Sequence, residues 1–473
     1  MEPMATRPAG RVIGRQAAVI GAGMAGLAAA AVLRRWFERV VLVERDALAD
    51  DGEARAGIPQ ARHNHLLLAR GQRLLDGLFP ALGDDLARAG APRLDWTHDA
   101  RMLLPSGWVP RFESGLESVS CSRVLLDAAI RRQVLALPGV EVMSARRAVG
   151  LAFDRPAGRV TGVELEDAGG GGGNRETLAA DLVLDASGRA SVAPDWLAAG
   201  GYERPDETSV NSYLGYASRW YEMPAGAGAG WRALLVNNRP PRLARGGVLM
   251  PIEGGRWAVT LGGMAKDYPP IDEAGFLAFA RSLATPALHD AIASARPITP
   301  VRGYRKTDNR WRRFERLARW PDGFFVTGDA VCAFNPAYGQ GLTIGAWGAE
   351  VLDRCLARGA RGAARRFQRA LTAVIKVPWD IAIGEDVRWP DTVGASPTAI
   401  NRAMYRYMDR VMRADPDDLH TWRTLFEVMH LVKPPTALLH PRVLRRALLR
   451  RRGAPRDGSA LPLEGELHQM EGT

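Results

Sequence analysis

Short apolar runs, separated by glycine, proline and polar residues, divide the chain into predicted strands and helices. Residues 16–20 and 40–43 are strand-like runs, and the alanine- and leucine-rich stretch between them, residues 27–36, has the composition of a helix. Far along the chain, the apolar run 324–326 is bounded by turn residues and fits a core strand. The helix that follows it is expected to begin near Gly341. These segments predict an α/β domain.

The middle of the chain carries two further groups of strand-like segments. Residues 141–153 and 159–165 are expected to be strands joined by a hairpin, and residues 180–189 a strand that ends in a turn. Between residues 205 and 305 the alternating segments typical of an antiparallel sheet are 209–221, 233–237, 247–252 and 256–261, and a helical stretch, 272–283, follows them. We expect this sheet to be inserted within the first domain and to form a wall over a ligand site.

From Trp347 onward the pattern is helical. Residues 442–452 form a basic amphipathic segment with leucine and valine side chains between arginines. Two interpretations are open: the segment packs its leucines on the body of the protein, or it binds an anionic surface. The first fifteen residues and residues 453–473 are expected to be loose tails.

Composition and charge narrow the class of protein. The 473 residues suffice for two domains, or for one large domain with a long insertion. The three cysteines are widely separated and lack metal-ligand spacing, so we expect a cytoplasmic protein without a disulfide framework or a metal site. No apolar run is long enough to span a bilayer, so we expect no transmembrane segment. The net charge of +11 comes with no nucleic-acid motif, so we expect no nucleic-acid partner.

The first candidate site is the turn that follows residues 16–20. Its sequence is Gly21-Ala22-Gly23-Met24-Ala25-Gly26, and the next strand ends at Glu44, 18 residues after Gly26. This is the dinucleotide-binding fingerprint between the strand and the helix that it requires. The glycines permit a tight turn and a close approach of backbone to a pyrophosphate, and Glu44 can accept hydrogen bonds from a ribose. An acid at this position disfavours a 2′-phosphate, so NADP is not expected in this site.

The second candidate site is the loop between the strand at 324–326 and the helix near Gly341. Asp329 is the only charged residue between Asp322 and Glu350. Gly339 and Gly341 leave backbone N–H groups open to a ligand, and a helix that begins there points its positive end at that ligand. A plain strand–turn–helix connection would explain this loop equally well, and the fingerprint upstream favours the ligand site.

Two further stretches carry polar side chains. Residues 57–65 read Gly57-Ile58-Pro59-Gln60-Ala61-Arg62-His63-Asn64-His65 and predict a loop before a helix. His63 and His65 are too close together for a standard helical metal pair. Ser122 is expected to cap another helix, and Arg123 beside it either faces solvent or reaches a phosphate or ribose.

Three segments together resemble one family: the fingerprint, Arg123, and the stretch Gly328-Asp329 to Pro336-Ala337-Tyr338-Gly339-Gln340-Gly341. The family is the FAD-dependent monooxygenases of the para-hydroxybenzoate hydroxylase and squalene epoxidase type, and the resemblance covers residues 15–390. The resemblance implies a Rossmann-like FAD-binding domain, an inserted antiparallel substrate sheet and a helical C-terminal region. It implies that the ADP half of FAD is held by Gly21, Gly23, Gly26 and Glu44, and that Arg123 contacts the ribose–phosphate region. Asp329 would bind the ribityl hydroxyls. The residues expected beside the isoalloxazine are Pro336, Gly339, Gln340, Gly341 and Leu342. The other residues expected to bind the cofactor are Met24, Ala25, Arg45, Arg62, His63 and Gly328.

The same resemblance divides the chain into segments. The FAD-binding domain is expected in three parts, at 15–90, 121–204 and 306–358. The substrate sheet is expected at 91–120 and 205–305, the C-terminal helical region at 359–452, and a loose tail at 453–473.

A closer resemblance is to bacterial epoxidases that act on polyene intermediates of polyether antibiotics. It rests on residues 57–65, on residues 248–257 and on Asn335-Pro336-Ala337-Tyr338-Gly339. One departure concerns Ser187-Gly188, which stand where aromatic hydroxylases of the superfamily carry an Asp-Gly pair. This leaves two sources of electrons open: NAD(P)H directly, or a separate flavin reductase. The Trp-x-Trp-x-Ile-Pro signature of flavin halogenases is absent from the sequence.

The implied activity is monooxygenation of an apolar natural-product intermediate, a polyketide or isoprenoid that is free or tethered to a carrier protein. The resemblance implies that reduced flavin and O2 form a C4a-hydroperoxide, which transfers one oxygen atom to an alkene. We select Gln60 and His65 for tests of a catalytic role. The alternatives are a flavin-dependent hydroxylase of an aromatic substrate, a reductase or dehydrogenase similar to geranylgeranyl reductase, and a nucleotide-binding protein without chemistry of its own.

Overall fold

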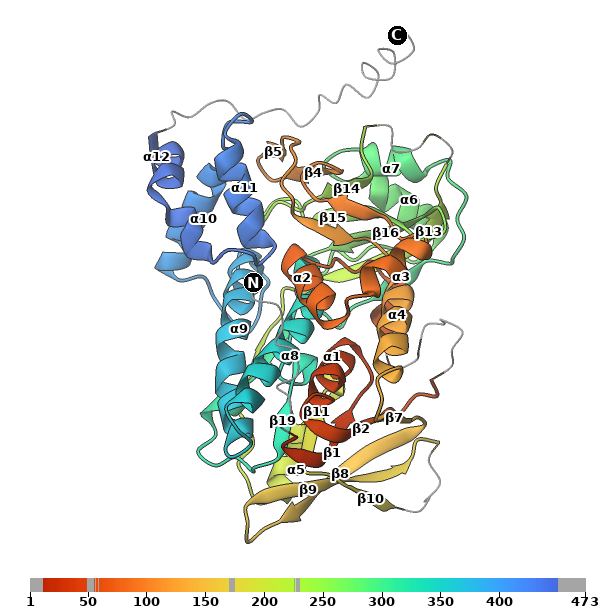
Figure 1. Cartoon of the computed structure of the whole chain (residues 1–473). Helices are drawn as coiled ribbons and strands as arrows, with labels where there is room; N and C mark the ends of the chain where they lie inside the picture. Colours follow the sequence, from red (N-terminus) through yellow and green to blue (C-terminus); the bar gives the residue numbers. More distant parts are fainter. Residues whose placement is uncertain are drawn as a thin grey trace.

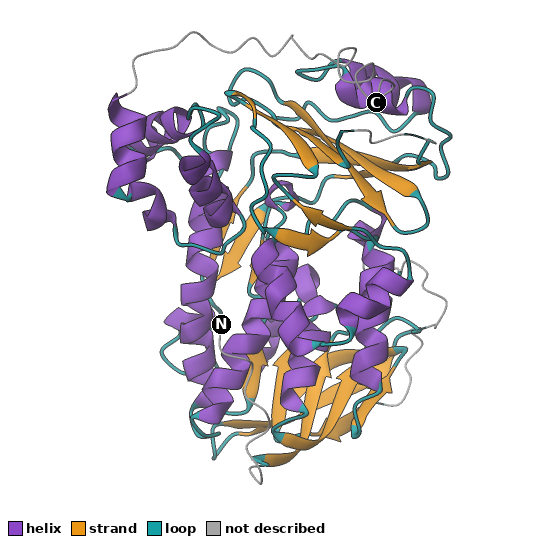
Figure 2. Ribbon diagram, turned by 45° about the horizontal axis from the view of Figure 1, so that its top comes forward, coloured by secondary structure: helices purple, strands orange, loops and turns teal. Residues whose placement is uncertain are grey.

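The computed structural model describes residues 12–48, 55, 57, 59–169, 175–224, 226 and 230–449 (Figure 1). Residues 1–11 of the predicted N-terminal tail, the predicted tail 453–473, most of the glycine-rich stretch 169–173 and the side chain of Gln60 lie outside the described residues. The predicted N-terminal tail is too long, because Gly14 and Arg15 already belong to the first strand. Two sheets lie toward opposite ends of the molecule, and most of the helices lie between or beside them (Figure 2).

A five-stranded parallel sheet forms the centre of the first layer, in the order β19-β11-β1-β2-β7. Its strands are β1 (Gly14–Ile20), β2 (Phe37–Val43), β7 (Val140–Met143), β11 (Leu182–Asp185) and β19 (Phe324–Val326). The C-terminal halves of β1, β2 and β11 are buried and apolar except for Asp185 at the end of β11, as expected for a parallel sheet that is covered on both faces. An antiparallel sheet of β8 (Arg146–Asp154), β9 (Arg159–Asp167) and β10 (Glu176–Ala179) lies next to it (Figure 1).

Helix α1 (Met24–Leu33) packs against this sheet and against α8 (Gly341–Ala357). Nine of its ten residues are buried, because its alanines and its glycine let neighbouring elements approach on every side. The other helices of this part are α2 (Ala69–Leu78), α3 (Leu82–Arg88), α4 (Arg123–Leu135) and α5 (Ala193–Ala199).

A seven-stranded, mainly antiparallel sheet forms the second layer, in the order β17-β13-β16-β15-β14-β4-β5. Its strands are β4 (Ala100–Leu104), β5 (Gly107–Trp108), β13 (Gly215–Glu222), β14 (Ala233–Val236), β15 (Arg245–Ile252), β16 (Arg256–Gly263) and β17 (Arg302–Tyr304). Helices α6 (Glu273–Arg281) and α7 (Ala287–Ile292) cover its outer face, where Phe276 and Leu288 pack with Val259 and Leu261. We call the opposite face the inner face.

The prediction of one strand over residues 141–153 is wrong. β7 belongs to the parallel sheet and β8 to its neighbour, because Ala145 adopts a φ of 55° and turns the chain between them. The prediction of one strand over 209–221 is also wrong. β12 (Glu207–Val210) pairs with β18 (Asn309–Arg312), which in turn pairs with β20 (Cys332–Ala333), and Tyr213 with a φ of 53° precedes β13. Helix α1 begins and ends three residues earlier than the predicted span 27–36.

The C-terminal helices are α9 (Ala363–Asp386), α10 (Ala399–Val411), α11 (Leu419–Met429) and α12 (Pro441–Leu449). α9 runs along the first layer, and the other three gather beside β4 and β5 (Figure 1). The described part of the basic segment 442–452 lies in α12, where Val443 and Ala447 are buried and Leu448 is exposed, so the segment packs only part of its apolar face. None of the described helices combines the length and the apolar character needed to cross a membrane.

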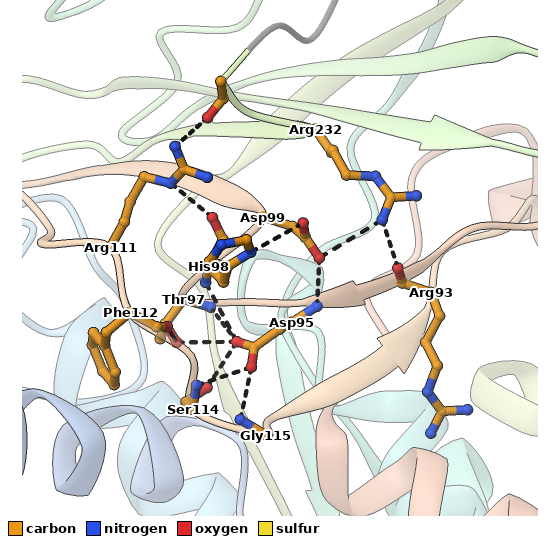
Figure 3. A network of polar contacts seen from close by, with 11 residues as sticks. Arg93, Asp95, Thr97, His98, Asp99, Arg111, Phe112, Ser114, Gly115 and Arg232 are labelled. Atoms are coloured by element: carbon orange, nitrogen blue, oxygen red, sulfur yellow. Dashed lines mark hydrogen bonds and ion pairs between the residues drawn. The ribbon is translucent and has the colours of Figure 1, made fainter.

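A polar network fixes the turn between β3 (Arg93–Asp95) and β4, where β6 (Glu117–Val119) pairs with β3 (Figure 3). The carboxylate of Asp95 accepts hydrogen bonds from the backbone N–H groups of Ser114, at 2.9 Å, and Gly115, at 2.7 Å. Burial raises the pKa of Asp95, but hydrogen bonds from Gly115, Ser114 and Thr97 outweigh burial and leave the pKa below its usual value. Arg423 of α11 donates to the carbonyl of Glu113, at 2.8 Å, so the β5–β6 loop that supplies Ser114 and Gly115 also contacts the C-terminal helices.

The predicted fold class is confirmed: an α/β domain with a parallel sheet, antiparallel sheets and a helical C-terminal region.

Candidate functional site

The glycine-rich turn lies between β1 and α1 and holds the helix close to the strand. Gly21 has a φ of +96°, a conformation that favours glycine, and its N–H donates to the carbonyl of Val43 at 2.8 Å. A Cβ on Gly26 would lie 1.9 Å from the carbonyl oxygen of Gly21, so no larger residue fits there. A Cβ on Gly23 would meet no atom within 4 Å. Gly23 therefore opens a space in front of the N-terminus of α1, where an anionic phosphate is favoured.

Glu44 closes this turn from the end of β2. One carboxylate oxygen accepts the N–H of Ala22 at 2.8 Å, and the other accepts the N–H of Asp46 at 3.0 Å. A guanidinium nitrogen of Arg55 lies 3.3 Å from the first of these oxygens. Each carboxylate oxygen can accept more than one hydrogen bond, so Glu44 retains capacity for ribose hydroxyls.

Arg123 begins α4, and the predicted cap is confirmed, since the hydroxyl of Ser122 accepts the N–H of Leu125 at 3.1 Å. The solvent-facing alternative for Arg123 is wrong, because the residue is buried and its Nε donates to Asp127 at 2.7 Å. Arg55 lies 3.9 Å from the other oxygen of Asp127. Glu44, Arg55, Arg123 and Asp127 thus form a buried cluster of two negative and two positive groups. The sequence predictions did not include Arg55 or Asp127.

The turn and the Asp329 loop are in contact, although some three hundred residues separate them in the sequence. A Cβ on Gly328 would lie 2.8 Å from the Cβ of Ala25, and Gly345 of α8 also approaches Ala25. Glycine at position 328, with a φ of +61°, therefore permits this approach. The two predicted halves of the cofactor site are brought together.

Asp329 lies in the 3-10 turn η4 (Gly328–Ala330) that follows β19. Burial raises the pKa of its carboxyl, and the positive charges of Arg189, Arg123 and Arg310 oppose that rise. Within the described residues, no hydrogen bond or ion pair reaches this carboxylate at contact distance. A partly buried carboxylate without such partners fits a site for ligand hydroxyls.

The loop that leads into α8 includes the 3-10 turn η5 (Pro336–Tyr338). Gly339 has a φ of +63°, and a Cβ on it would lie 2.9 Å from the Cβ of Leu66. A Cβ on Gly341 would meet no atom within 4 Å. Gln340 is buried, and its side-chain oxygen has no hydrogen-bond partner among the described residues. The N-terminus of α8 is therefore open toward the predicted ring site, with no side chain capping it.

A buried carboxylate at the end of α9 holds this loop in place. Asp386 accepts hydrogen bonds from the hydroxyl of Tyr338 at 2.7 Å and from the amides of Asn309 at 2.6 Å and Asn335 at 3.1 Å. Burial raises the pKa of Asp386, and these hydrogen bonds act in the opposite direction. Asp386 and Asn309 are absent from the sequence predictions. A signal was present, because Asp386 continues the apolar stripe of Ile375, Trp379 and Ala382 on α9.

The remaining predicted residues lie in different surroundings. Arg45 and Arg62 are exposed, and His65 is half-buried. His63 is buried and contacts the inner face of the seven-stranded sheet, where its Nδ1 lies 2.8 Å from the hydroxyl of Ser218. The next residue, Asn64, donates to the carbonyl of Ala258 at 2.9 Å. Residues 63–64 therefore connect the first layer to the second. Within the described residues, no group of three or more His, Cys, Asp or Glu side chains is arranged to hold a metal ion.

Comparisons with known proteins agree with this geometry. The family model described as "FAD dependent oxidoreductase" matches residues 16–207. Protein Rv3254 of Mycobacterium tuberculosis (strain ATCC 25618 / H37Rv) is 37% identical over 346 residues, which make up 72% of this chain and 72% of that protein.

Solved structures share the fold. A flavoprotein/dehydrogenase from Cytophaga hutchinsonii has a TM-score of 0.65 at 17% identity, with 91% of this chain and 96% of that chain covered. The flavin-dependent brominase Bmp2 has a TM-score of 0.62 at 13% identity, with 88% and 93% covered. 2-Methyl-3-hydroxypyridine-5-carboxylic acid oxygenase has a TM-score of 0.55 at 22% identity, with 78% and 90% covered.

The residues present fit the cofactor of this family. The space at Gly23, the carboxylates of Glu44 and Asp329, and the open start of α8 suit a dinucleotide with phosphates at one end and a polar ring edge at the other. The chain belongs to the FAD-dependent oxidoreductases.

Proposed function

We propose that this oxidoreductase is a monooxygenase that inserts one oxygen atom of O2 into an apolar natural-product intermediate by epoxidation of an alkene. The observation that carries the proposal is the open N-terminus of α8 at Gly341, beside the Asp329 loop and near the inner face of the second sheet. A helix N-terminus favours negative charge, which the ring edge of a reduced flavin carries. When bound, reduced FAD supplies the activation of O2.

In this proposal the chain's own residues hold the cofactor at both ends. Glu44 accepts hydrogen bonds from the ribose, the N-terminus of α1 faces the pyrophosphate, and Asp329 accepts hydrogen bonds from the ribityl hydroxyls. Arg123 adds positive charge between these two ends. The Pro336–Gly341 loop, held by Asp386, shapes the ring face, so changes in this loop are expected to alter oxygen transfer more than folding.

The titratable groups near the inner face favour an alkene over a phenol as substrate. Hydroxylation of a phenol is assisted by a base whose pKa lies near the working pH. Burial and the charge of Arg62 lower the pKa of His63 to about 4, which makes it a weak base. Burial raises the pKa values of Tyr216 and Tyr304, which keeps both hydroxyls protonated. Epoxidation needs no such base. Gln60 and His65 stay as candidates for a catalytic role.

The reaction takes two electrons from NAD(P)H and releases the second oxygen atom of O2 as water. We propose that a separate flavin reductase delivers these electrons. The support is the Ser187-Gly188 pair, at which the buried carboxylate of Asp185 accepts the Ser187 N–H at 2.9 Å and the Ser191 hydroxyl at 2.5 Å. Bleaching of bound FAD by NADH or NADPH alone would instead show direct reduction.

Oxygen labelling tests the proposed activity. The FAD-loaded protein is photoreduced under anaerobic conditions with EDTA as the electron donor, and is then mixed with 18O2 and geraniol, an uncharged isoprenoid alkene. The expected product is a geraniol epoxide that contains one 18O atom. Hydrogenated geraniol formed without oxygen would support the reductase alternative. A labelled hydroxyl group on a parallel phenol probe, with geraniol unchanged, would support the aromatic hydroxylase.

A further inference from the structure

Three aromatic side chains meet on the inner face of the seven-stranded sheet. His63 approaches Tyr216 edge-on with a centroid distance of 4.6 Å, Tyr216 lies 5.4 Å from Tyr304, and His63 lies 5.9 Å from Tyr304. Tyr216 and Tyr304 are direct cross-strand partners on β13 and β17. His63 reaches them from the first layer. We call these three residues the aromatic cluster.

The aromatic cluster lies on the side of the sheet that faces the cofactor site. Side chains alternate along a strand, and Ala217, between Tyr216 and Ser218, belongs to the core under α6 and α7. Tyr216 and Ser218 therefore point to the opposite, inner face. Burial raises the pKa of Tyr304, and Arg189 and Asp329 are among the charges that act on it. The aromatic cluster is thus near Asp329, the predicted anchor of the ribityl chain.

Each member of the aromatic cluster has a polar atom without a partner. Among the described residues, the hydroxyls of Tyr216 and Tyr304 and the Nε2 atom of His63 have no hydrogen bond. His63 is 5% exposed and Tyr216 is 7% exposed. None of these three unpaired atoms is completely buried, so each of them is accessible to solvent. Buried polar groups that open onto a space without protein partners mark a place for a ligand's polar group.

A chain of hydroxyl groups fixes the ring of His63. Its Nδ1 lies 2.8 Å from the Ser218 hydroxyl, which lies 2.6 Å from the Thr260 hydroxyl. The N–H of Asn64 donates to Thr260 at 3.3 Å. These contacts occupy Nδ1, and Nε2 is the ring nitrogen that has no hydrogen bond to a described residue.

The inner face changes from polar to apolar along one row of cross-strand neighbours. Ser218 pairs with Thr260, Thr260 with Val248, and Val248 with Leu235. Beside Tyr216 the partner on β16 is Gly262, where a Cβ would make only ordinary contact, 3.5 Å from Leu214. The row therefore has hydrogen-bonding groups at one end and aliphatic side chains at the other. Gly262 places no side chain beside the aromatic cluster.

The aromatic cluster carries no formal charge near neutral pH. Burial and Arg62 lower the pKa of His63 to about 4, so its imidazole is neutral. Burial raises the pKa of Tyr216, so its hydroxyl stays protonated. The nearby guanidinium of Arg189 already pairs with Asp308 at 2.9 Å. An uncharged oxygen suits this environment, whereas a carboxylate would be desolvated without a cationic partner.

We propose that the aromatic cluster binds the uncharged oxygen of the substrate, a hydroxyl or carbonyl group, while the hydrocarbon part extends along Val248 and Leu235. The inference rests on the proposed function and specifies its substrate class: an alkene with a neutral oxygen-bearing head and no carboxylate. His63 acts as a positioning residue through Nε2.

Calorimetric titration of the FAD-loaded protein at pH 8 tests this proposal with two probes of one skeleton, geraniol and the anion geranate. We expect geraniol to bind at least about tenfold more tightly. The Tyr216→Phe/Tyr304→Phe double variant is expected to lose about tenfold in geraniol affinity. Tyr202→Phe is the matched control, because Tyr202 is not part of the aromatic cluster. Its ring stacks on that of Phe153 in β8, with a centroid distance of 6.1 Å. It should bind geraniol as the unchanged protein does.

Flavin content and melting temperature verify that the variants are folded, and Tyr304→Phe alone, at a half-buried position, serves if the double variant is unstable. Equal or tighter binding of geranate, absence of geraniol binding, or wild-type geraniol affinity in the folded Tyr variants would overturn the proposal. The titration needs no turnover. Intact geraniol selectivity without incorporation of 18O would therefore remove the monooxygenase function and leave the binding site.

Discussion

The two ends of the cofactor site are built in different ways. At the dinucleotide end, the turn Gly21–Gly26 and Glu44 come from one β–α–β segment, and backbone atoms make most of the close contacts. At the ring end, Asn309, Asn335, Tyr338 and Asp386 come from separate parts of the chain, and side chains make the contacts.

This difference determines which changes each end tolerates. The dinucleotide end depends on the absence of side chains, so an added methyl group is the damaging change. The ring end depends on hydrogen bonds to one buried carboxylate, so removal of a partner is the damaging change. The two ends meet at Ala25 and Gly328, so damage to either one is expected to weaken the binding of the same cofactor.

The largest effect is expected from Gly26→Ala. Its Cβ would lie 1.9 Å from the carbonyl oxygen of Gly21, so the turn must shift, at a cost above about 3 kcal/mol. Thermal unfolding and flavin absorbance per protein should both show the loss. Gly23→Ala is the matched control, because its Cβ meets no protein atom within 4 Å. It should unfold as wild type and still retain less FAD. Normal stability and flavin content in Gly26→Ala would contradict the backbone-built turn.

The next largest effect is expected from Asp386→Ala at the ring end. It leaves the buried donors of Asn309, Asn335 and Tyr338 without their acceptor and is expected to cost about 3 kcal/mol of unfolding free energy. Denaturant unfolding measures this cost. Asp380→Ala on the same helix removes an exposed pair with Lys376 and should change stability by less than about 0.5 kcal/mol. Equal effects of the two variants would show that the Asp386 network does not hold the loop.

A smaller effect is expected from acid at the inner face. The pKa of His63 is about 4 in the folded protein, below the ordinary value of 6.5, so between these values the unfolded chain binds the proton more readily. The free energy of unfolding therefore falls as the pH falls, by about 2 kcal/mol at pH 5 for one such histidine. His430, whose pKa is also lowered to about 4, adds a similar fall.

Replacement His63→Gln should remove about half of this fall in unfolding free energy between pH 7 and pH 5. A profile in His63→Gln as steep as that of wild type would mean that His63 is not held neutral in the folded state.

The sequence predicted the dinucleotide end better than the ring end, for a physical reason. The fingerprint and Glu44 are local: the strand, the turn, the helix and the acid follow one another within 31 residues, from Gly14 to Glu44. Both predicted motifs, and their flanking β1, β19 and α8, are present in the structure. Single strands were predicted at 141–153 and 209–221 because the apolar pattern does not reveal that Ala145 and Tyr213 adopt positive φ values.

The contacts that the sequence did not reveal are long-range. Tyr216 meets Tyr304 only because β13 pairs with β17, and Asp386 reaches Asn309 only because α9 packs beside β18. His63 was assigned to the cofactor with its neighbours in residues 57–65, but the pairing with Ser218, 155 residues away, could not be deduced from spacing. Only Asp386 left a sequence signal, a carboxylate on an otherwise apolar helix stripe.

The most direct test of the two-ended cofactor site is the affinity for FAD of the Asp329→Asn variant, measured by flavin titration of the apoprotein. The Asp329 carboxylate lacks a hydrogen-bonded or ion-paired protein partner among the described residues, and burial raises its pKa. We expect the variant to bind FAD at least about tenfold more weakly, because a charge-assisted hydrogen bond to the ribityl chain is lost. Its apoprotein should melt no lower than wild type. Wild-type affinity for FAD, or a destabilised apoprotein, would contradict the account.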